Sequence, residues 1–440
     1  MVILGFLIVF FGYKKNKKSM IFIILFVLAT LTLANFTNIW STQLFNLTPW
    51  KFISLGLLFV SFFIVLNLID ENIPDIYVLN MLVLLGSIIL VLSDNLLTLY
   101  LGLELQTFST FILVAKNRSS IKSSEAGLKY FILGAISSGF YLLGIVLLFL
   151  FGFDLNIKNL VDLLDEMLVV TSFSLISLSF CFKLTLFPLH FWIPDIYEGS
   201  SWDVITLLST LPKVSVLCVV SQMLVNSNVM LAFSLISIGI GTLGALNQNK
   251  FKRLLAYSGI SHMGFILLGY SILNNEGFMV SNFYLLIYIL TMVSVFILIV
   301  KISNYTEYII ELSSVRFTNK LLSATLLLLI LSIAGIPPLS GFLSKWFLIW
   351  TSIEFKYNIS AIVVVLFSIT GASYYLRIVK ILYFQRRSSY FTWQSILISE
   401  SKNNEISYFV LGSSTFFVVF LMLNFSSIIN ITNWLVYSSF

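Results

Sequence analysis

Long apolar runs, separated by short polar connections, extend along the whole chain. A bilayer core of about 30 Å requires roughly 20 apolar residues in each crossing helix. Only helices and closed barrels can satisfy their backbone in lipid, and these runs are continuous rather than alternating, which favours helices. The pattern predicts an all-α polytopic membrane protein with about 14 transmembrane helices. Their ranges are 1–12, 20–36, 52–69, 75–93, 95–115, 126–152, 168–188, 203–225, 229–248, 253–273, 279–301, 319–350, 359–384 and 408–430.

Prolines interrupt the seventh and the twelfth of these runs. Pro188 lies in FCFKLTLFPLHFW, and Pro337 and Pro338 divide LSIAGIPPLSGFLSKWF. A proline lacks the N–H group that would bind the carbonyl four residues earlier, so the carbonyls of Ile333 and Ala334 lose their helical partners. Non-helical backbone at membrane depth is tolerated only against protein or a wet cavity. The pattern therefore predicts that helices 7 and 12 are discontinuous.

The two interruptions lie five helices apart, which suggests an internal repeat. Broken helices at matching places in two halves are typical of a transport site. We therefore pair helices 4–8 with helices 9–13. The resulting division is an N-terminal part of helices 1–3 (1–74), a first repeat (75–228), a second repeat (229–390) and a C-terminal helix 14 (391–440).

Composition narrows the classes of function. Hydrophobic residues make up 59% of the chain and charged residues 10%, against about 25% charged in soluble proteins. No stretch is polar enough for a separate nucleotide-binding or nucleic-acid-binding domain. Cys181 and Cys218 both lie in apolar runs, and the two histidines leave little for haem or zinc. We expect no metal site, no cofactor site and no nucleic-acid partner.

Charges in the connections predict the orientation. Basic clusters follow the first, fifth, ninth and thirteenth runs, which all place them on one side. By the positive-inside rule this side is the cytoplasm or the mitochondrial matrix. Asp70, Glu71 and the acidic stretch Asp195–Glu198 lie on the same side and do not fit the rule. The 42 phenylalanines, encoded by AT-rich codons, suggest an AT-rich genome such as a mitochondrial one.

Several ionisable residues lie inside the predicted helices, where a charge costs a few kcal/mol or more and usually has a function. Glu104 lies about 15 Å into the fifth helix. Lys183 precedes the break at Pro188, and Lys213 lies near the middle of the eighth helix. Lys345 follows the second break, and His262 lies in the tenth helix. One acid and three lysines at similar depth predict a proton relay, to which His262 adds a group with a near-neutral pKa.

A change of distance between Glu104 and Lys183 would switch this relay. Burial lowers the pKa of a lysine in general, and a nearby carboxylate raises it again. Structural interpretations remain open: a membrane lysine can snorkel or form a structural pair, and a histidine can bond two helices. Glu125 and Lys129 are explained as well by an i,i+4 pair at a helix start as by transport.

Six segments carry a resemblance to a known family. They are LGLELQTFSTFILVA, KSSEAGLKYFILGAISSGF, FKLTLFPLHFWIPDIYEGS, LPKVS, KRLLAYSGISHMGF and GIPPLSGFLSKWF. Together they resemble subunit 2 of NADH–ubiquinone oxidoreductase, respiratory complex I, and its bacterial N-type counterpart, over residues 75–384. The wider family includes the other antiporter-like subunits of the complex and the Mrp-type cation/proton antiporters.

The resemblance implies a 14-helix protein with two inverted five-helix repeats and a hydrophilic axis at mid-membrane. The family's glutamate falls on Glu104 and its three lysines on Lys183, Lys213 and Lys345, while His262 lies where the axis passes. It implies a proton-translocating subunit of NADH:ubiquinone reductase without a redox centre. NADH, FMN, iron–sulfur clusters and ubiquinone would be bound by other subunits. Its partners would be lipids and the other membrane-arm subunits, including the antiporter-like ones.

Two other functions remain as alternatives, and the location also has two. The chain could be a subunit of an Mrp-type cation/proton antiporter. It could also be a structural scaffold of the membrane arm, whose charges only hold helices together. The expected location is the mitochondrial inner membrane, with the bacterial cytoplasmic membrane as the alternative.

Overall fold

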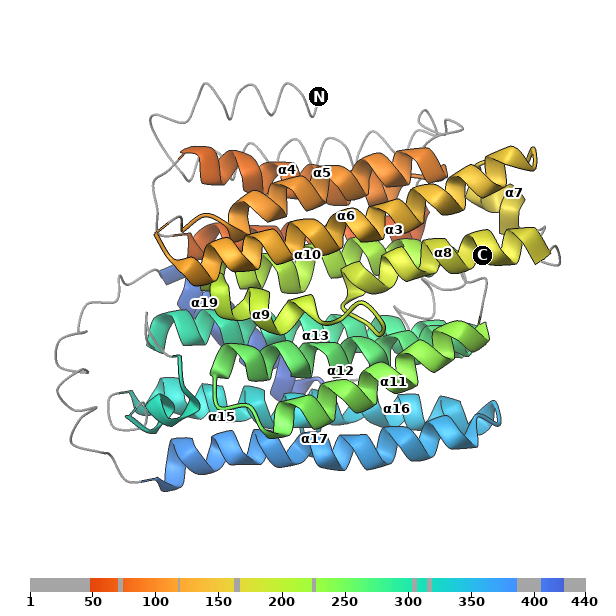
Figure 1. Cartoon of the computed structure of the whole chain (residues 1–440). Coiled ribbons are helices and arrows are strands. Elements are labelled where there is room, and N and C mark those ends of the chain that lie inside the picture. Colours follow the sequence, from red (N-terminus) through yellow and green to blue (C-terminus); the bar gives the residue numbers. More distant parts are fainter. Residues whose placement is uncertain are drawn as a thin grey trace.

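The computed structural model describes residues 48–69, 74–117, 119–161, 167–223, 227–302, 307–314, 319–385 and 405–422. These residues are almost entirely helical (Figure 1). The helices of the first half are α3 (Pro49–Leu68), α4 (Pro74–Leu92), α5 (Leu96–Val114), α6 (Ile121–Leu150), α7 (Ile157–Val161), α8 (Met167–Leu184), α9 (Trp192–Gly199) and α10 (Trp202–Val220). Those of the second half are α11 (Ser227–Leu246), α12 (Phe251–Ser271), α13 (Asn275–Ile302), the 3-10 helix η2 (Ile309–Ser314), α15 (Lys320–Ala334), α16 (Ser340–Glu354), α17 (Asn358–Phe384) and α19 (Glu405–Phe420).

The prediction of an all-α membrane protein is confirmed. Eight of the described helices, 18 to 30 residues long, are apolar enough to cross a membrane, and each matches a predicted span. Among the described residues, strand pairing is limited to isolated bridges, Asn95 with Asn156 and Lys250 with Tyr308. The predicted spans 1–12 and 20–36 lie outside the described residues.

The helices run side by side as one bundle (Figure 1). Helices α4, α5 and α6 lie along one flank, and α15, α16 and α17 lie along the opposite flank. Helix α10 packs against α3, α4, α8 and α13, and α13 packs against α12, α15 and α16. Of the membrane-spanning windows, those of α10 and α13 are 94% and 83% buried inside the protein. Side chains on these central helices are therefore shielded from lipid.

Two irregular segments separate helices at the predicted prolines. Residues 185–191 connect α8 to α9 and contain Pro188. Residues 335–339 connect α15 to α16 and contain Pro337 and Pro338, so the predicted span 319–350 consists of two helices.

Candidate functional site

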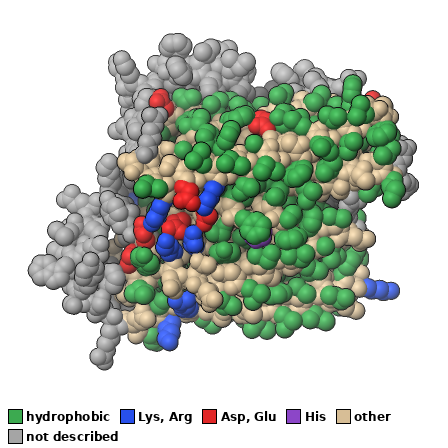
Figure 2. Space-filling model, viewed as in Figure 1, with side chains coloured by type: hydrophobic (Ala, Val, Ile, Leu, Met, Phe, Trp, Pro, Cys, Tyr) green, Lys and Arg blue, Asp and Glu red, His purple; other side chains and the backbone are tan. Residues whose placement is uncertain are grey.

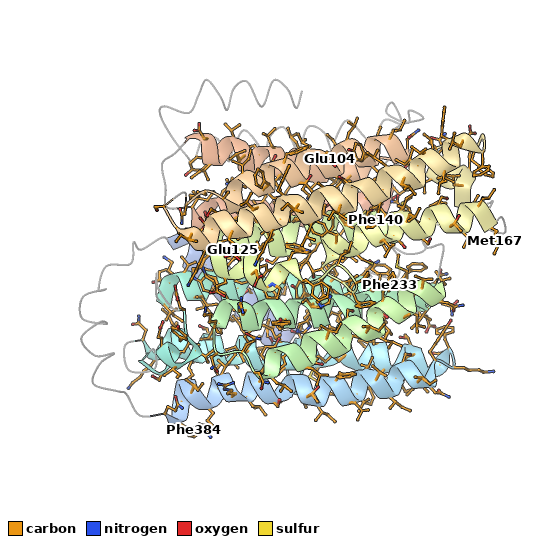
Figure 3. All side chains as sticks on the ribbon, in the orientation of Figure 1. Glu104, Glu125, Phe140, Met167, Phe233 and Phe384 are labelled. Atoms are coloured by element: carbon orange, nitrogen blue, oxygen red, sulfur yellow. The ribbon has the colours of Figure 1, made fainter. Side chains whose placement is uncertain are left out.

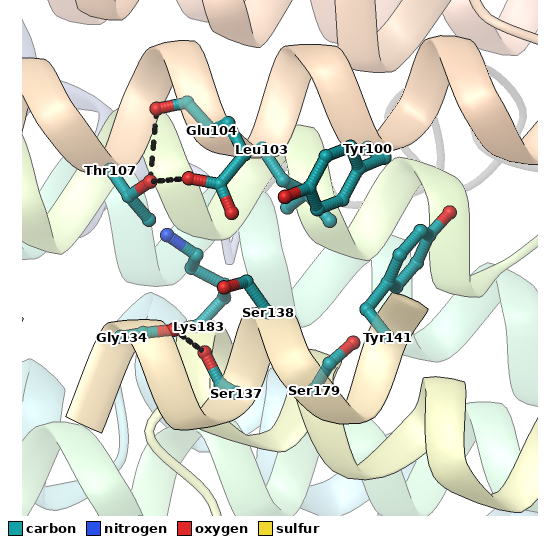
Figure 4. A pocket seen from close by; sticks show the side chains of 10 residues that line it. All are labelled: Tyr100, Leu103, Glu104, Thr107, Gly134, Ser137, Ser138, Tyr141, Ser179 and Lys183. Carbon is teal, nitrogen blue, oxygen red and sulfur yellow. Dashed lines mark hydrogen bonds between the residues drawn. The ribbon is translucent and has the colours of Figure 1, made fainter. Parts of the chain in front are cut away.

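Glu104 and Lys183 line one pocket between α5, α6 and α8 (Figure 4). Glu104 lies about halfway along the bundle, whereas Glu125 lies near one end and Met167 near the other (Figure 3). The carboxylate accepts a hydrogen bond of 3.4 Å from Thr107 Oγ1, which also donates to the Glu104 carbonyl at 2.9 Å. The acid is therefore held on α5 at mid-depth, with its carboxylate directed into the pocket.

Lys183 points into this pocket from α8. Its side chain is 6% exposed, and its Nζ atom has no hydrogen-bond partner among the described residues. The rings of Tyr130 and Phe182 lie 5.8 and 5.7 Å from Nζ. Glu104 lies within electrostatic range of the lysine. The two charges that the sequence paired share a pocket, but Lys183 donates no direct hydrogen bond to the carboxylate.

Lys213 lies in the centre of the bundle, on α10. It is 1% exposed, and its Nζ donates a hydrogen bond of 2.9 Å to the hydroxyl oxygen of Tyr288 on α13. The Tyr288 ring centre lies 5.1 Å from Nζ. Gly259 of α12 faces both groups, since a Cβ atom there would lie 3.5 Å from Lys213 Nζ and 3.5 Å from Tyr288 Oη. The lysine is thus held by a phenol rather than by a carboxylate.

His262 lies on α12 beside this pair and is surrounded by tyrosines. Its Nδ1 shares a hydrogen bond of 2.8 Å with the Tyr284 hydroxyl, and its Nε2 shares one of 3.3 Å with the Tyr375 hydroxyl. The imidazole lies within electrostatic range of both Lys213 and Lys345. His262 therefore lies near both Lys213 and Lys345, with a hydroxyl group at each ring nitrogen.

Lys345, on α16, is bound to the end of α15. Its Nζ donates hydrogen bonds to the carbonyl oxygens of Ala334 at 2.7 Å and of Ile333 at 3.3 Å. These are the carbonyls that the sequence predicted to lose their helical partners. Gly335 follows them with a φ of +83°, in the left-handed region that favours glycine. Lys345 is 6% exposed, so it caps a helix end instead of snorkelling to the surface.

At the first break the carbonyl oxygen of Phe182 accepts two hydrogen bonds of 3.1 Å, one from the indole Nε1 of Trp192 and one from the backbone N–H of Thr185. Lys183 takes no part in either bond. Two further buried groups of the break, Thr185 Oγ1 and His190 Nδ1, have no hydrogen-bond partner among the described residues. Buried polar groups are usually hydrogen-bonded to protein or to water, so these two groups are available to bind water.

A cluster of ion pairs joins α6, α9 and α12 at one end of the bundle, where it interrupts a hydrophobic face (Figure 2). Its pairs are Lys129–Glu125 at 2.7 Å, Lys129–Asp195 at 2.7 Å, Arg253–Asp195 at 2.7 Å, Arg253–Glu198 at 2.5 Å, Lys250–Glu198 at 2.5 Å, Lys122–Glu198 at 3.5 Å and Lys122–Glu307 at 3.9 Å. The expected i,i+4 pair of Glu125 and Lys129 is confirmed. The acidic stretch that did not fit the charge rule is explained, because its acids pair with basic residues of the same end.

Glu198 is the central acid of this cluster, on α9 outside the candidate membrane spans. Burial alone would raise the pKa of its carboxyl. The hydrogen bond from Lys250 and the charges of Arg253, Lys250 and Lys122 outweigh burial and hold this pKa below its ordinary value. The carboxylate therefore stays ionised at neutral pH and keeps α9 attached to α12.

Sequence reasoning missed several residues of the site. Tyr284, Tyr288 and Tyr375 contact Lys213 or His262, but nothing in the sequence distinguishes them from packing aromatics among 19 tyrosines. It also missed Lys51, which is 1% exposed and pairs with Asp94. Among the described residues no group of three or more His, Cys, Asp or Glu could hold a metal ion.

Comparisons with known proteins agree on one family. Residues 93–371 match the family described as "NADH:quinone oxidoreductase/Mrp antiporter, TM". NADH-ubiquinone oxidoreductase chain 2 of Metridium senile is 39% identical over 81% of this chain and 95% of its own length. NADH-quinone oxidoreductase subunit N of Pelagibacter ubique is 35% identical over 78% of this chain and 73% of its own length.

Two solved structures share the fold. A chain of respiratory complex I from Thermus thermophilus superimposes with a TM-score of 0.84 at 23% identity, covering 98% of this chain and 96% of that chain. A chain of the Mrp complex from a Dietzia species gives a TM-score of 0.83 at 18% identity, covering 99% and 95%. Identities this low show the fold alone.

Proposed function

This chain belongs to the NADH:quinone oxidoreductase/Mrp antiporter membrane family, and from that premise we propose that it is a proton-translocating antiporter-like subunit of respiratory complex I. The match to an NADH-ubiquinone oxidoreductase chain 2, which covers 81% of this chain and 95% of that relative, supports this assignment over the Mrp branch. Other subunits of the complex would bind NADH, FMN, the iron–sulfur clusters and ubiquinone. The partners of this chain are then lipids and the remaining membrane-arm subunits.

The observation that carries the proposal is a set of buried ionisable side chains on α10, α12 and α16. Lys213, His262 and Lys345 are at most 6% exposed, and His262 lies within electrostatic range of both lysines. A charge in such a position is costly and is usually retained for function. Glu104 and Lys183 add an acid and a base that line one pocket. These groups line up as steps of a proton relay.

The relay operates through changes of distance. Quinone chemistry in other subunits shifts Glu104 relative to Lys183. Since a buried lysine holds its proton more tightly beside a carboxylate, moving the acid away favours release of the proton toward Lys213. The proton then passes by way of His262 to Lys345. Lysine suits these steps because its proton affinity changes readily with its surroundings, whereas an arginine stays charged.

The test measures proton translocation and assembly together. Glu104→Gln and Lys213→Ala are each introduced into the complete complex. We expect both variants to assemble on native gels, to oxidise NADH with an artificial acceptor, and to lose most NADH-driven proton translocation. Normal translocation per electron in both variants would refute the relay. Failure of Lys213→Ala to assemble would favour the scaffold function.

The subunits that co-purify with this chain distinguish the complex I function from the Mrp-type function. The fold does not distinguish them, because the chain matches the Mrp structure as well as it matches the complex I structure. Native-gel separation of solubilised membranes, with in-gel NADH oxidation and mass spectrometry, identifies the partners. Migration with flavin and iron–sulfur subunits supports complex I, and a small band without NADH activity supports the antiporter. The mitochondrial inner membrane is the proposed location, which fractionation of organelles would test against a bacterial membrane.

A further inference from the structure

We propose that the hydroxyl groups of Tyr288 and Tyr284 carry the proton between Lys213 and His262. This inference rests on the proposed function and adds two residues of α13 to it. Lys213 and His262 lie on α10 and α12, and α13 packs against both helices. The two tyrosines occupy the place where the three helices meet.

The first step is set by the hydrogen bond between Lys213 and Tyr288. A lysine ammonium can only donate, so the phenol oxygen is the acceptor in the 2.9 Å contact. The hydroxyl proton of Tyr288 is then free to point toward a further acceptor. Tyr288 is 3% exposed, so this acceptor lies inside the protein. A buried phenol that accepts from one titratable group and can donate to another is a proton carrier by geometry.

The second step is set by Tyr284 and the imidazole. Tyr284 lies four residues before Tyr288, on the same face of α13, and its hydroxyl shares a 2.8 Å hydrogen bond with His262 Nδ1. The His262 ring lies 5.7 Å from the Tyr288 ring and 5.9 Å from the Tyr284 ring. Four residues of helix rise about 6 Å, and a water between the two hydroxyl groups would complete the path.

Gly259 leaves space beside Lys213 and Tyr288, where the first proton transfer takes place. A Cβ atom at this position would only just contact Lys213 Nζ and Tyr288 Oη, at 3.5 Å each. The glycine therefore keeps free the place where the ammonium and the phenol meet.

The proton balance closes without any redox step. The Lys213 ammonium gives one proton to Tyr288 Oη while the original Tyr288 hydroxyl proton moves on toward Tyr284. Tyr284 in the same way accepts one proton and gives its own to His262 Nδ1. His262 thereby becomes an imidazolium. One proton has moved from Lys213 to His262, and both phenols, Tyr288 and Tyr284, end neutral.

Variants that remove one hydroxyl and keep the ring test the inference. Tyr288→Phe and Tyr284→Phe are compared with Tyr270→Phe, because Tyr270 of α12 also donates to a residue of α13, Asn282, but touches no relay group. We expect NADH-driven proton translocation by the assembled complex to fall about a hundredfold in the first two variants, the low end for a lost proton-transfer group. The control should stay within about twofold, and assembly and NADH oxidation with an artificial acceptor should not change.

The outcomes separate this inference from the proposed function. If Tyr288→Phe and Tyr284→Phe translocate protons as fast as Tyr270→Phe while Lys213→Ala does not, the tyrosine relay is wrong and the proposed function stands. If Lys213→Ala also translocates normally, both fail. If Tyr288→Phe does not assemble, the result for Tyr284→Phe decides. A normal rate of proton translocation in Tyr284→Phe overturns the inference, and a slow rate supports it.

Discussion

Replacement of Gly341 by alanine tests the contact between the two halves of the second break. Gly341 lies in the first turn of α16 against Ser332 of α15. A Cβ atom on Gly341 would lie 1.7 Å from the Ser332 carbonyl oxygen and 2.7 Å from its carbonyl carbon. Both are backbone atoms, so no change of rotamer relieves the overlap. The helices must move apart at this point.

The expected cost follows from the size of this displacement. Ordinary contact between heavy atoms needs about 3.5 Å, so the backbones must separate by well over 1 Å. Overpacking typically costs about 1–3 kcal/mol, and more when the backbone is involved. The same movement stretches the 2.7 Å bond from Lys345 to Ala334, which as a charge-assisted bond is worth about 1.5–3 kcal/mol. Gly341→Ala should therefore destabilise the protein by about 4 kcal/mol.

Gly56→Ala is the matched control, because a Cβ atom on Gly56 of α3 would meet nothing within 4 Å. An alanine in the interior of a helix should there be neutral or stabilise by about 0.5–1 kcal/mol. Each variant is measured by the amount of assembled complex on native gels and by its thermal inactivation midpoint. If Gly341→Ala assembles fully and inactivates at the same temperature as Gly56→Ala, the close contact of α15 and α16 is refuted.

Three further predictions concern other contacts. Trp192→Phe removes one of the two donors to the Phe182 carbonyl, which keeps the Thr185 N–H, and should cost about 0.5–1.5 kcal/mol in thermal stability, so an unchanged inactivation midpoint would contradict that role. Lys51→Met leaves Asp94 and two backbone carbonyls without their partner and should cost about 3–5 kcal/mol, which the double variant with Asp94→Leu should partly restore in the same assay. The pKa of Glu198 is lowered in the folded protein. The stabilisation that this carboxylate contributes to the folded protein is therefore present above the ordinary carboxyl pKa of about 4.3, and it is lost as the pH falls through the lowered pKa of Glu198. The stability difference between wild type and Glu198→Gln should accordingly stay constant from pH 7 to 5 and shrink only below that range.

The sequence predicted the helical class, because it depends on apolar run length, and the prolines that it singled out lie in the irregular segments 185–191 and 335–339. It also predicted that the carbonyls of Ile333 and Ala334 would lose their partners. It did not predict which group would replace those partners. Lys345 lies 11 residues beyond Ala334, across an irregular segment, and whether its Nζ reaches back depends on how the two helices are angled.

The partners of Lys213 could not be predicted for a similar reason. Tyr288 lies 75 residues away along the chain, and a tyrosine on an apolar helix face is usually a packing residue. The prediction that Lys183 pairs with Glu104 placed both residues correctly in one pocket. The absence of a direct hydrogen bond to Lys183 Nζ depends on distances of an ångström or two between helices, which no residue pattern encodes.

The lysines beside the two breaks differ in their hydrogen bonds, and this difference bears on how the proposed relay would work. At the first break Lys183 Nζ donates no hydrogen bond to a described residue, so its interaction with Glu104 is electrostatic. At the second break Lys345 itself binds the carbonyls, so loss of its proton would weaken the end of α15. In the proposed relay, a proton arriving at Lys183 would change its electrostatic interaction with Glu104 in the shared pocket, whereas a proton leaving Lys345 would weaken its bonds to the end of α15. Protonation at the first break would then respond to the position of Glu104, and release at the second break would favour movement of a helix.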